Sequence, residues 1–250
     1  MRLRHVLTVL SFAILAAPSL AADSPEAAQA ADTFVDKLGS TPVTLPIPPG
    51  FGSPSATPKV VSDLIVRSVP VAYRYVGMLM AQGDLDEVAA GGDLHGRMKR
   101  YAVLLTYRDY EGKGMPAPLF DQVKLAIHQQ GAQLMKAAEA VAAPAVDHMS
   151  KDVAKMTGDA KTSMKIGAVS MLGVFDEHPN SIALASAGPM TMTDKNGTAT
   201  FNQLMAMAVV LLHGKPIGFH VYTDYGSQAD LDWAEDQVRD WVKRVNELNP

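Results

Sequence analysis

Methionine is the residue type whose spacing first suggests chemistry, because it occurs three times as a Met-x-Met pair within a predicted strand. Side chains two residues apart in a strand point to the same face of a sheet, so both sulfurs of each pair share a face. Soft thioether ligands select Cu(I), and a chain without cysteine would have to bind it through Met and His. The alternative is that these methionines fill irregular space in a core. The candidate metal ligands are Met78, Met80, Met190, Met192, Met205 and Met207.

Four tyrosines gather on two further predicted strands, at Tyr73, Tyr75, Tyr101 and Tyr107. Alternation along a strand places Tyr73 and Tyr75 on a common side, and likewise Tyr101 and Tyr107. Rings with an apolar body and a polar tip are common in ligand clefts and at partner surfaces. The same rings pack equally well in a core beneath a helix. We therefore predict these four residues as candidate ligand-binding or partner-binding residues, with burial in the core as the alternative.

The linear motifs of catalytic sites are absent from this sequence. It contains no Gly-x-Ser-x-Gly, no Ser-x-x-Lys and no His-Glu-x-x-His, and Gly91-Gly92 is not followed by a phosphate-loop lysine. It also contains no cysteine, which excludes thiol catalysis, disulfides and Cys-ligated metals. The sequence therefore predicts no catalytic residue and no cofactor. An enzyme whose site is assembled from residues far apart in the sequence stays open.

Residues 1–21 have the three parts of a cleaved signal peptide. A basic start is followed by an apolar stretch over residues 6–17, which is too short to span a bilayer comfortably. Pro18 then precedes Ser19 and Ala21, which are small residues at the positions that a signal peptidase reads. A short signal anchor that stays attached is the alternative. Cleavage predicts a periplasmic or secreted protein with no stable membrane anchor.

Charge and composition narrow the class of partner. The chain carries 22 Lys and Arg against 26 Asp and Glu, a formal net charge of −4. This balance disfavours nucleic acid and anionic lipid as general partners. An apolar fraction of 48% excludes a disordered or fibrous chain. The partners that we expect are an envelope protein or a small ligand, and no nucleic acid.

The fold class that the patterns predict is α+β, an antiparallel sheet covered by two helices. From residue 164 onward the hydrophobic period is two, which predicts a C-terminal meander of four strands. The dipeptide Asn196-Gly197 is a strong signal for a tight hairpin between two of them. A long central helix is expected from Pro116, with a kink or break at Pro144, because a proline ring clashes with the preceding helical turn.

The C-terminal helix has the clearest pattern in the chain. Its apolar residues recur at alternating steps of three and four up to Leu248, which predicts an amphipathic helix from about residue 228. Earlier strands are expected at 71–80, as a central strand, and at 101–107. The predicted division of the chain is a signal peptide over 1–21, a flexible or short helical lead-in over 22–40, and a single α+β domain over 41–250.

Two stretches resemble a known group of proteins. One is the run VTLPIPPGF at 43–51, and the other is the end of the chain, where Gly214-Lys215, a strand through Tyr222 and a helix with Trp233 and Trp241 follow in order. Together they resemble exported proteins of proteobacteria, and the order of elements is similar to the PsbP-like α/β/α sandwich. That family mostly consists of binding or accessory modules, so the resemblance implies such a role and no reaction.

These observations lead to one functional expectation with two alternatives. We expect an exported, periplasmic, non-catalytic binding or accessory protein. The alternatives are a periplasmic Cu(I)-binding protein that uses the Met-x-Met pairs, and an enzyme with a dispersed site.

Overall fold

The computed structural model describes residues 32–90, 98–157, 159–195 and 197–250. The predicted signal peptide lies outside the described residues, as do residues 22–31 of the predicted lead-in and Asn196 of the predicted hairpin turn. The strands are β1 (Thr33–Leu38), β2 (Thr41–Pro46), β3 (Tyr73–Met80), β4 (Arg100–Tyr107), β5 (Ser163–Ile166), β6 (Ser170–His178), β7 (Ser181–Asp194), β8 (Gly197–Leu212) and β9 (Lys215–Asp224). The helices are η1 (Pro54–Ala56), α2 (Lys59–Ser68), α3 (Gln82–Ala89), α4 (Arg108–Glu111), α5 (Ala117–Thr157) and α6 (Gln228–Leu248).

Seven of the strands in the described part of the chain form one curled antiparallel sheet. Its order is β3-β4-β9-β8-β7-β5, and β6 also pairs with β7. Strands β6 to β9 follow one another as a meander, with β7 and β8 paired from Ser181 and Val210 to Asp194 and Gly197. The predicted α+β fold with a C-terminal meander is therefore confirmed. The strand that we predicted from residue 164 is divided in two, because β5 and β6 pair with different parts of β7.

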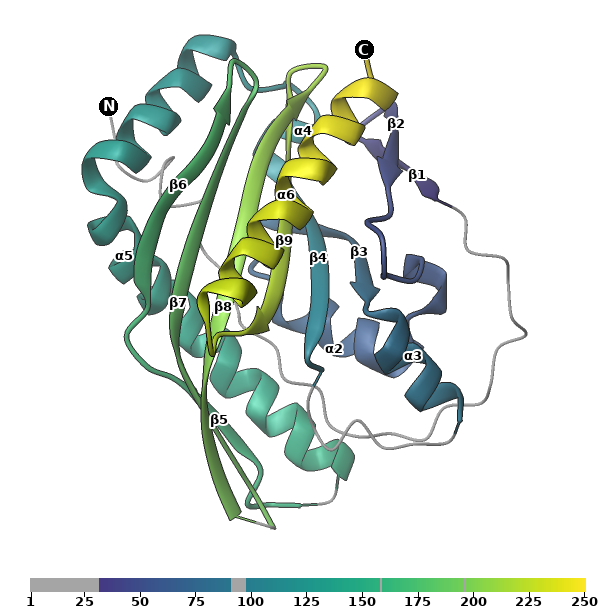
Figure 1. The fold of residues 1–250 in the computed structure, drawn as a ribbon, viewed down its shortest axis with the longest axis vertical. Helices are drawn as coiled ribbons and strands as arrows, with labels where there is room; N and C mark the ends of the chain where they lie inside the picture. The colour runs from purple at the N-terminus through teal and green to yellow at the C-terminus, as the bar shows by residue number, and fades with distance from the viewer. Residues whose placement is uncertain (1–31, 91–97, 158, 196) are drawn as a thin grey trace.

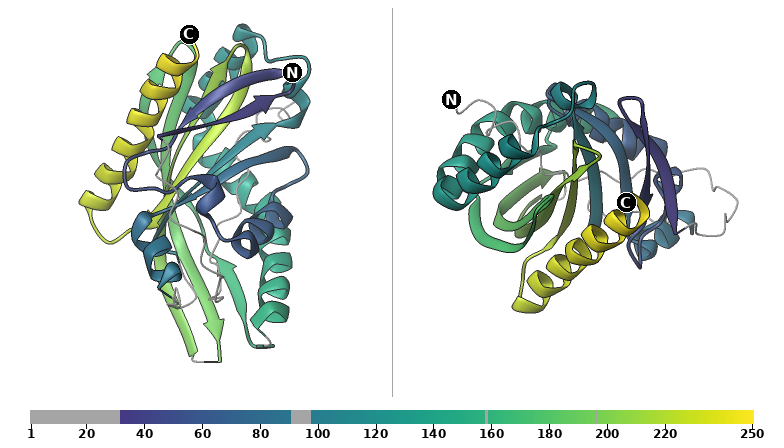
Figure 2. Two further views of the ribbon diagram at one scale, coloured as in Figure 1. Left: turned by 90° about the vertical axis from the view of Figure 1, so that its right-hand side faces the viewer. Right: turned by 90° about the horizontal axis from the view of Figure 1, so that it is seen from above.

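Helices cover both faces of this sheet. Figure 1 shows α6 across the near face, with α5 behind the sheet, and the side view in Figure 2 places the sheet between them. Side chains alternate between the faces, so that Met205 and Met207 of β8 belong to the core beside α5, while Leu204 and Ala206 belong to the core beside α6. The molecule thus has two apolar layers, one on each side of the sheet.

The N-terminal hairpin corrects the expected lead-in. Residues 33–38 form β1 rather than a flexible or helical segment, and β1 pairs with β2 in a separate two-stranded sheet. Leu38 is fully buried and Phe34 packs against the core beside α6, which gives this strand a period of two. Gly39 adopts a φ of +64°, the left-handed conformation that the tight turn between β1 and β2 requires.

Helix α6 agrees with the predicted amphipathic helix and holds this hairpin in place. A capping box begins the helix, in which the Ser227 and Asp230 side chains each bond the other's backbone N–H. Further along, the Trp241 indole N–H donates to the Pro46 carbonyl at 3.1 Å. Asn249 accepts a hydrogen bond from the Thr44 N–H at 2.9 Å and donates to the Thr44 carbonyl at 2.8 Å. The end of the chain therefore completes the exposed edge of β2.

Strand β3 lies at one end of the sheet, not in the centre as we predicted. It pairs with β4 alone within the sheet order. Its side chains are nevertheless buried, because η1 packs against it and Phe51 forms an isolated bridge with Ala81 at its end. The apolar residues on both faces of β3 are therefore explained by the segments that cover this strand, and not by a central position in the sheet.

Helix α5 is helical on both sides of Pro144, and its irregular residue is Gln130 instead. Gln130 has φ −134° and ψ 19°, outside the helical region. The next residue, Gly131, faces the sulfur of Met171 on β6 so closely that a Cβ there would overlap it. The interruption thus lies beside a close contact of the helix with the sheet, whereas Pro144 is exposed and water can satisfy the carbonyl that it leaves unpaired. Among the described helices, none combines the length and apolarity needed to cross a bilayer.

Candidate functional site

The four predicted tyrosines lie on the side of the sheet that faces α2 and α5. Tyr73, Tyr101 and Tyr107 are buried, and Tyr75 is partly buried. Tyr73 and Tyr107 face each other with ring centroids 5.1 Å apart, while Tyr101 stacks on Tyr222 at 4.7 Å. Burial raises the pKa of Tyr75 to about 12, and that of Tyr107 well above its ordinary value. Both hydroxyls are therefore neutral at physiological pH, and a binding role for the four tyrosines stays a prediction.

The methionine pairs share this face, but the register separates them. Five of the six sulfurs belong to buried residues, and Met192 is partly buried against the same core. Met78 and Met207 lie in one row across the sheet, but β4 and β9 stand between their strands, which puts them about 14 Å apart. Met190 is opposite Phe201 and Met205 is opposite Ser186, so these pairs are offset along neighbouring strands. The Cu(I) hypothesis stays a prediction, with the pairs in three separate places.

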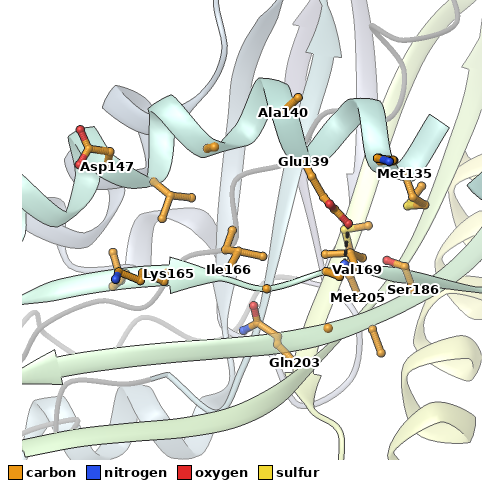
Figure 3. A pocket seen from close by; sticks show the side chains of 18 of the residues that line it. Met135, Glu139, Ala140, Asp147, Lys165, Ile166, Val169, Ser186, Gln203 and Met205 are labelled. Atoms are coloured by element: carbon orange, nitrogen blue, oxygen red, sulfur yellow. Dashed lines mark hydrogen bonds between the residues drawn. The ribbon is translucent and has the colours of Figure 1, made fainter. Parts of the chain in front are cut away.

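A cavity of about 770 Å³ lies between the second half of α5 and the sheet. Its roof comes from α5, one side from β5 and the segment that follows it, and its floor from β7 and β8, as Figure 3 shows. Apolar side chains dominate the lining. They include Met135, Val146, Met164, Ile166, Val169 and Met205.

Two hydrogen bonds tie the side of the cavity to its roof. The Ser150 hydroxyl of α5 accepts from the backbone N–H of Met164 on β5 at 2.9 Å and donates to its own helix at Val146. Further along, the Glu139 carboxylate of α5 accepts from the backbone N–H of Val169 at 2.5 Å. The segment between β5 and β6 is therefore fixed to α5 across the cavity, and this second contact is the dashed line in Figure 3.

Charge lies at the periphery of the cavity rather than on its floor. Lys136, Asp147 and Lys165 line the cavity as exposed residues, and the partly buried Glu139 carboxylate of the roof is bound to the Val169 N–H. The floor instead carries two neutral polar side chains, Ser186 at 1% and Gln203 at 5% exposure. An arrangement of apolar walls, few polar groups inside and charges outside is typical of small-molecule sites.

Gln203 connects the cavity to one of the predicted tyrosines. Its Nε2 donates to the Tyr101 hydroxyl at 3.4 Å. Its Oε1 is buried and accepts no hydrogen bond from the described part of the protein. Of the four tyrosines, Tyr101 is thus linked to the floor of the cavity through the side chain of Gln203.

Comparisons with known proteins identify no family. No family model matches the chain, and no curated protein matches it. Two solved structures are similar. One is the Ran-binding protein Mog1p of Saccharomyces cerevisiae, with 10% identity over 87% of this chain and 92% of that chain at a TM-score of 0.25. The other is a point mutant of Mog1, with 9% identity over 88% of this chain and 93% of that chain at a TM-score of 0.28. The likeness to Mog1p is a low one, and membership of the PsbP-like family stays a prediction.

Sequence reasoning did not find the cavity, because its lining comes from α5, β5, β7 and β8. No linear motif joins residues so far apart in the chain. One signal was present: Gln203 occupies an inward-facing position of a strand whose next inward residues, Met205 and Met207, are apolar. A buried polar residue in such a series is more informative than an exposed apolar one.

In the described residues, no group of three His, Asp or Glu side chains is placed to hold a metal ion. Two histidine–carboxylate pairs lie at the end of β6, where His128 Nε2 of α5 is 2.7 Å from Glu177 and His178 Nε2 is 3.3 Å from Asp176. These are two separate pairs. Their side chains are exposed or partly exposed, and none of them lines the cavity.

Proposed function

We propose that this chain is an exported, non-catalytic binding protein of the periplasm, with its ligand in the cavity between α5 and the sheet. The observation that carries the proposal is the cavity itself. Its volume of about 770 Å³ lies within the range of roughly 300–1,000 Å³ of small-molecule sites. A largely apolar lining favours a ligand that is largely apolar too.

The polar groups around the cavity support binding rather than catalysis. The Ser150 hydroxyl is engaged with the backbone of α5 and β5, and the Glu139 carboxylate with the Val169 N–H. No histidine lines the cavity among the described residues, so neither Ser150 nor Ser186 has an imidazole base beside it. These polar groups hold the walls together and leave the floor neutral.

Ligand binding is tested with N-phenyl-1-naphthylamine, whose fluorescence rises in an apolar site. We expect saturable binding of one probe per chain. The variant Ser186→Phe places a ring in the cavity from its floor and should weaken binding by a factor of about ten or more, because the ring occupies volume that the probe would fill. Fluorescence titration of the purified mature chain and of the variant measures the stoichiometry and the affinity of the probe.

The matched control is Ser55→Phe, which makes the same change at an exposed position of η1, on the other side of β3 from the cavity. It should bind the probe as the unmodified chain does. If Ser186→Phe does not fold, Ile166→Trp fills the cavity from the partly exposed β5 and replaces it. Absence of saturable binding, or equal binding by the cavity variants, contradicts the proposed site.

Export rests on the predicted signal peptide. N-terminal sequencing of the protein recovered from the periplasm of a Gram-negative host should begin at Ala22 or Asp23. An intact Met1 in the membrane fraction would instead show a retained anchor and remove the periplasmic assignment.

A further inference from the structure

We propose that the cavity selects a neutral, largely apolar ligand that carries a hydroxyl or N–H donor, and that Gln203 binds this donor through its side-chain carbonyl. This inference rests on the proposed function, since it names the class of ligand for the same site. The structural basis is a buried amide on the floor of an apolar cavity, held at one end by Tyr101.

Gln203 departs from the pattern of its own strand. The following inward residues of β8 are Met205, Met207 and Val209, all buried in the core beside α5. Gln203 continues this row and is 5% exposed, yet it carries a polar amide. Burial of an amide costs free energy unless its hydrogen bonds are made. A polar residue at this position therefore requires a partner inside the cavity.

The two ends of the amide have different environments. Nε2 donates to the Tyr101 hydroxyl, whereas Oε1 accepts nothing from the described part of the chain. Figure 3 shows the amide of Gln203 rising from β8 toward Ile166, that is, into the cavity. The last torsion of a glutamine side chain is broad, so a small rotation turns Oε1 toward a bound molecule. A carbonyl oxygen accepts hydrogen bonds and cannot donate, which is why the ligand must supply the donor.

Tyr101 acts as a positioning residue for this amide. Its ring is fully buried and stacks on Tyr222 with 4.7 Å between centroids, so the hydroxyl has a fixed place beneath Gln203. The hydrogen bond at 3.4 Å orients Nε2 toward the sheet and leaves Oε1 as the free end of the amide. An acceptor that the protein already holds in place costs less entropy on binding than one that must first be ordered.

The charges around the cavity indicate that the ligand is neutral. The charged residues of the lining are two lysines, Lys136 and Lys165, and two carboxylates, Asp147 and the Glu139 side chain that accepts from the Val169 N–H, so the lining favours neither a cation nor an anion strongly. The floor offers Ser186 and Gln203, which bear no charge. An ion placed against such a floor would lose its hydration without a counter-charge.

A matched pair of probes tests this selection. 2-Naphthol and 2-methoxynaphthalene share an aromatic body, but only the naphthol can donate a hydrogen bond. We expect the full mature chain to bind 2-naphthol about tenfold more tightly at neutral pH, because the ether leaves Oε1 without a partner. Competition of each probe against N-phenyl-1-naphthylamine gives the two dissociation constants.

The variant Gln203→Leu removes the acceptor and nearly preserves the volume of the side chain. It should bind both probes with equal affinity, near that of the unmodified chain for 2-methoxynaphthalene. Tyr101→Phe removes the positioning hydroxyl and should lower the preference for the naphthol without weakening the ether. The control Gln237→Leu makes the same change on α6, which covers the other face of the sheet, and should keep the tenfold preference.

The outcomes separate the two proposals. If both probes bind the unmodified chain equally, or if Gln203→Leu retains the preference, the selection by Gln203 is wrong while the cavity remains a binding site. If neither probe nor the fluorophore binds up to its solubility limit, the proposed function itself fails. Loss of the preference in Gln203→Leu, with the preference kept in Gln237→Leu, supports both.

Discussion

Trp241→Ala is expected to lower the free energy of unfolding by about 3–5 kcal/mol, the usual cost of truncating a large buried aromatic residue. Trp241 is 1% exposed and stacks on Phe219 with 4.6 Å between ring centroids. Its indole N–H also donates to the Pro46 carbonyl at 3.1 Å, so the substitution leaves a cavity and a buried acceptor without its donor. The ring therefore joins three segments, α6, the sheet and the β1–β2 hairpin.

Urea unfolding followed by far-UV circular dichroism measures this loss. Trp233→Ala is the matched control on the same helix, because Trp233 is only partly buried and contacts Phe51 and Arg100 from the surface. Trp233→Ala should lower the free energy of unfolding by about 1 kcal/mol, in the range of a partly exposed cation–π contact. Trp241→Phe keeps an aromatic ring and removes the N–H. Its loss in the free energy of unfolding should lie between those of the two alanine variants. If Trp241→Ala and Trp233→Ala lowered the free energy of unfolding equally, the inference that Trp241 joins α6, the sheet and the hairpin would be wrong.

The elements that were predicted correctly are those whose pattern is local. The spacing from residue 228 to Leu248 gives one apolar stripe, and the strands that form β7, β8 and β9 have a hydrophobic period of two, so each pattern predicts its own element. Strand β1 was missed because the alanine-rich stretch before it favours a helix, and its strand state depends on pairing with β2. We predicted the irregularity of α5 at Pro144, because proline is disfavoured inside a helix. The irregular residue is Gln130, next to Gly131, which packs against Met171.

The candidate site could not be predicted in the same way, because it is a property of contacts between elements. Tyr101 was singled out for its ring, but its link to the cavity depends on Gln203, which is on a strand that neighbours β9 rather than β4. Met205 was singled out as a candidate copper ligand, and the structure places it in the lining of the cavity, opposite Ser186. Residue type alone therefore singled out one residue in the lining of the cavity and one beside it, but neither the cavity nor the polar group within it.

The second large effect that we expect is a loss of stability in mild acid, caused by His220. It lies on β9 between Val103 of β4 and Met207 of β8, and it is fully buried. Its imidazole covers Gly218, where a Cβ would collide with it, so the side chain is enclosed by the sheet itself. Burial lowers the pKa of His220 from 6.5 to about 3, because the charged form would be desolvated.

The sign of the pH dependence follows from that depressed pKa. Below about pH 6.5 the unfolded chain binds a proton at residue 220 that the folded chain does not bind until about pH 3. The folded state therefore has its full stability above pH 6.5 and loses about 1.4 kcal/mol per pH unit from this group as the pH falls. Between pH 7.5 and pH 5 the contribution amounts to about 2 kcal/mol.

Comparison of His220→Leu with the unmodified chain isolates this contribution, because every other ionisable side chain is present in both. The free energy of unfolding, measured in urea at pH 7.5 and pH 5, should fall by about 2 kcal/mol less in the variant. His148→Leu, at an exposed position of α5, should fall as much as the unmodified chain does. If His220→Leu does not fold, NMR of the labelled His220 imidazole in the unmodified chain tests the lowered pKa directly. Its resonances should not move between pH 8 and pH 5. A titration near pH 6.5 would show that residue 220 is protonated inside the sheet, and that the apolar layer beside α5 admits water at this point.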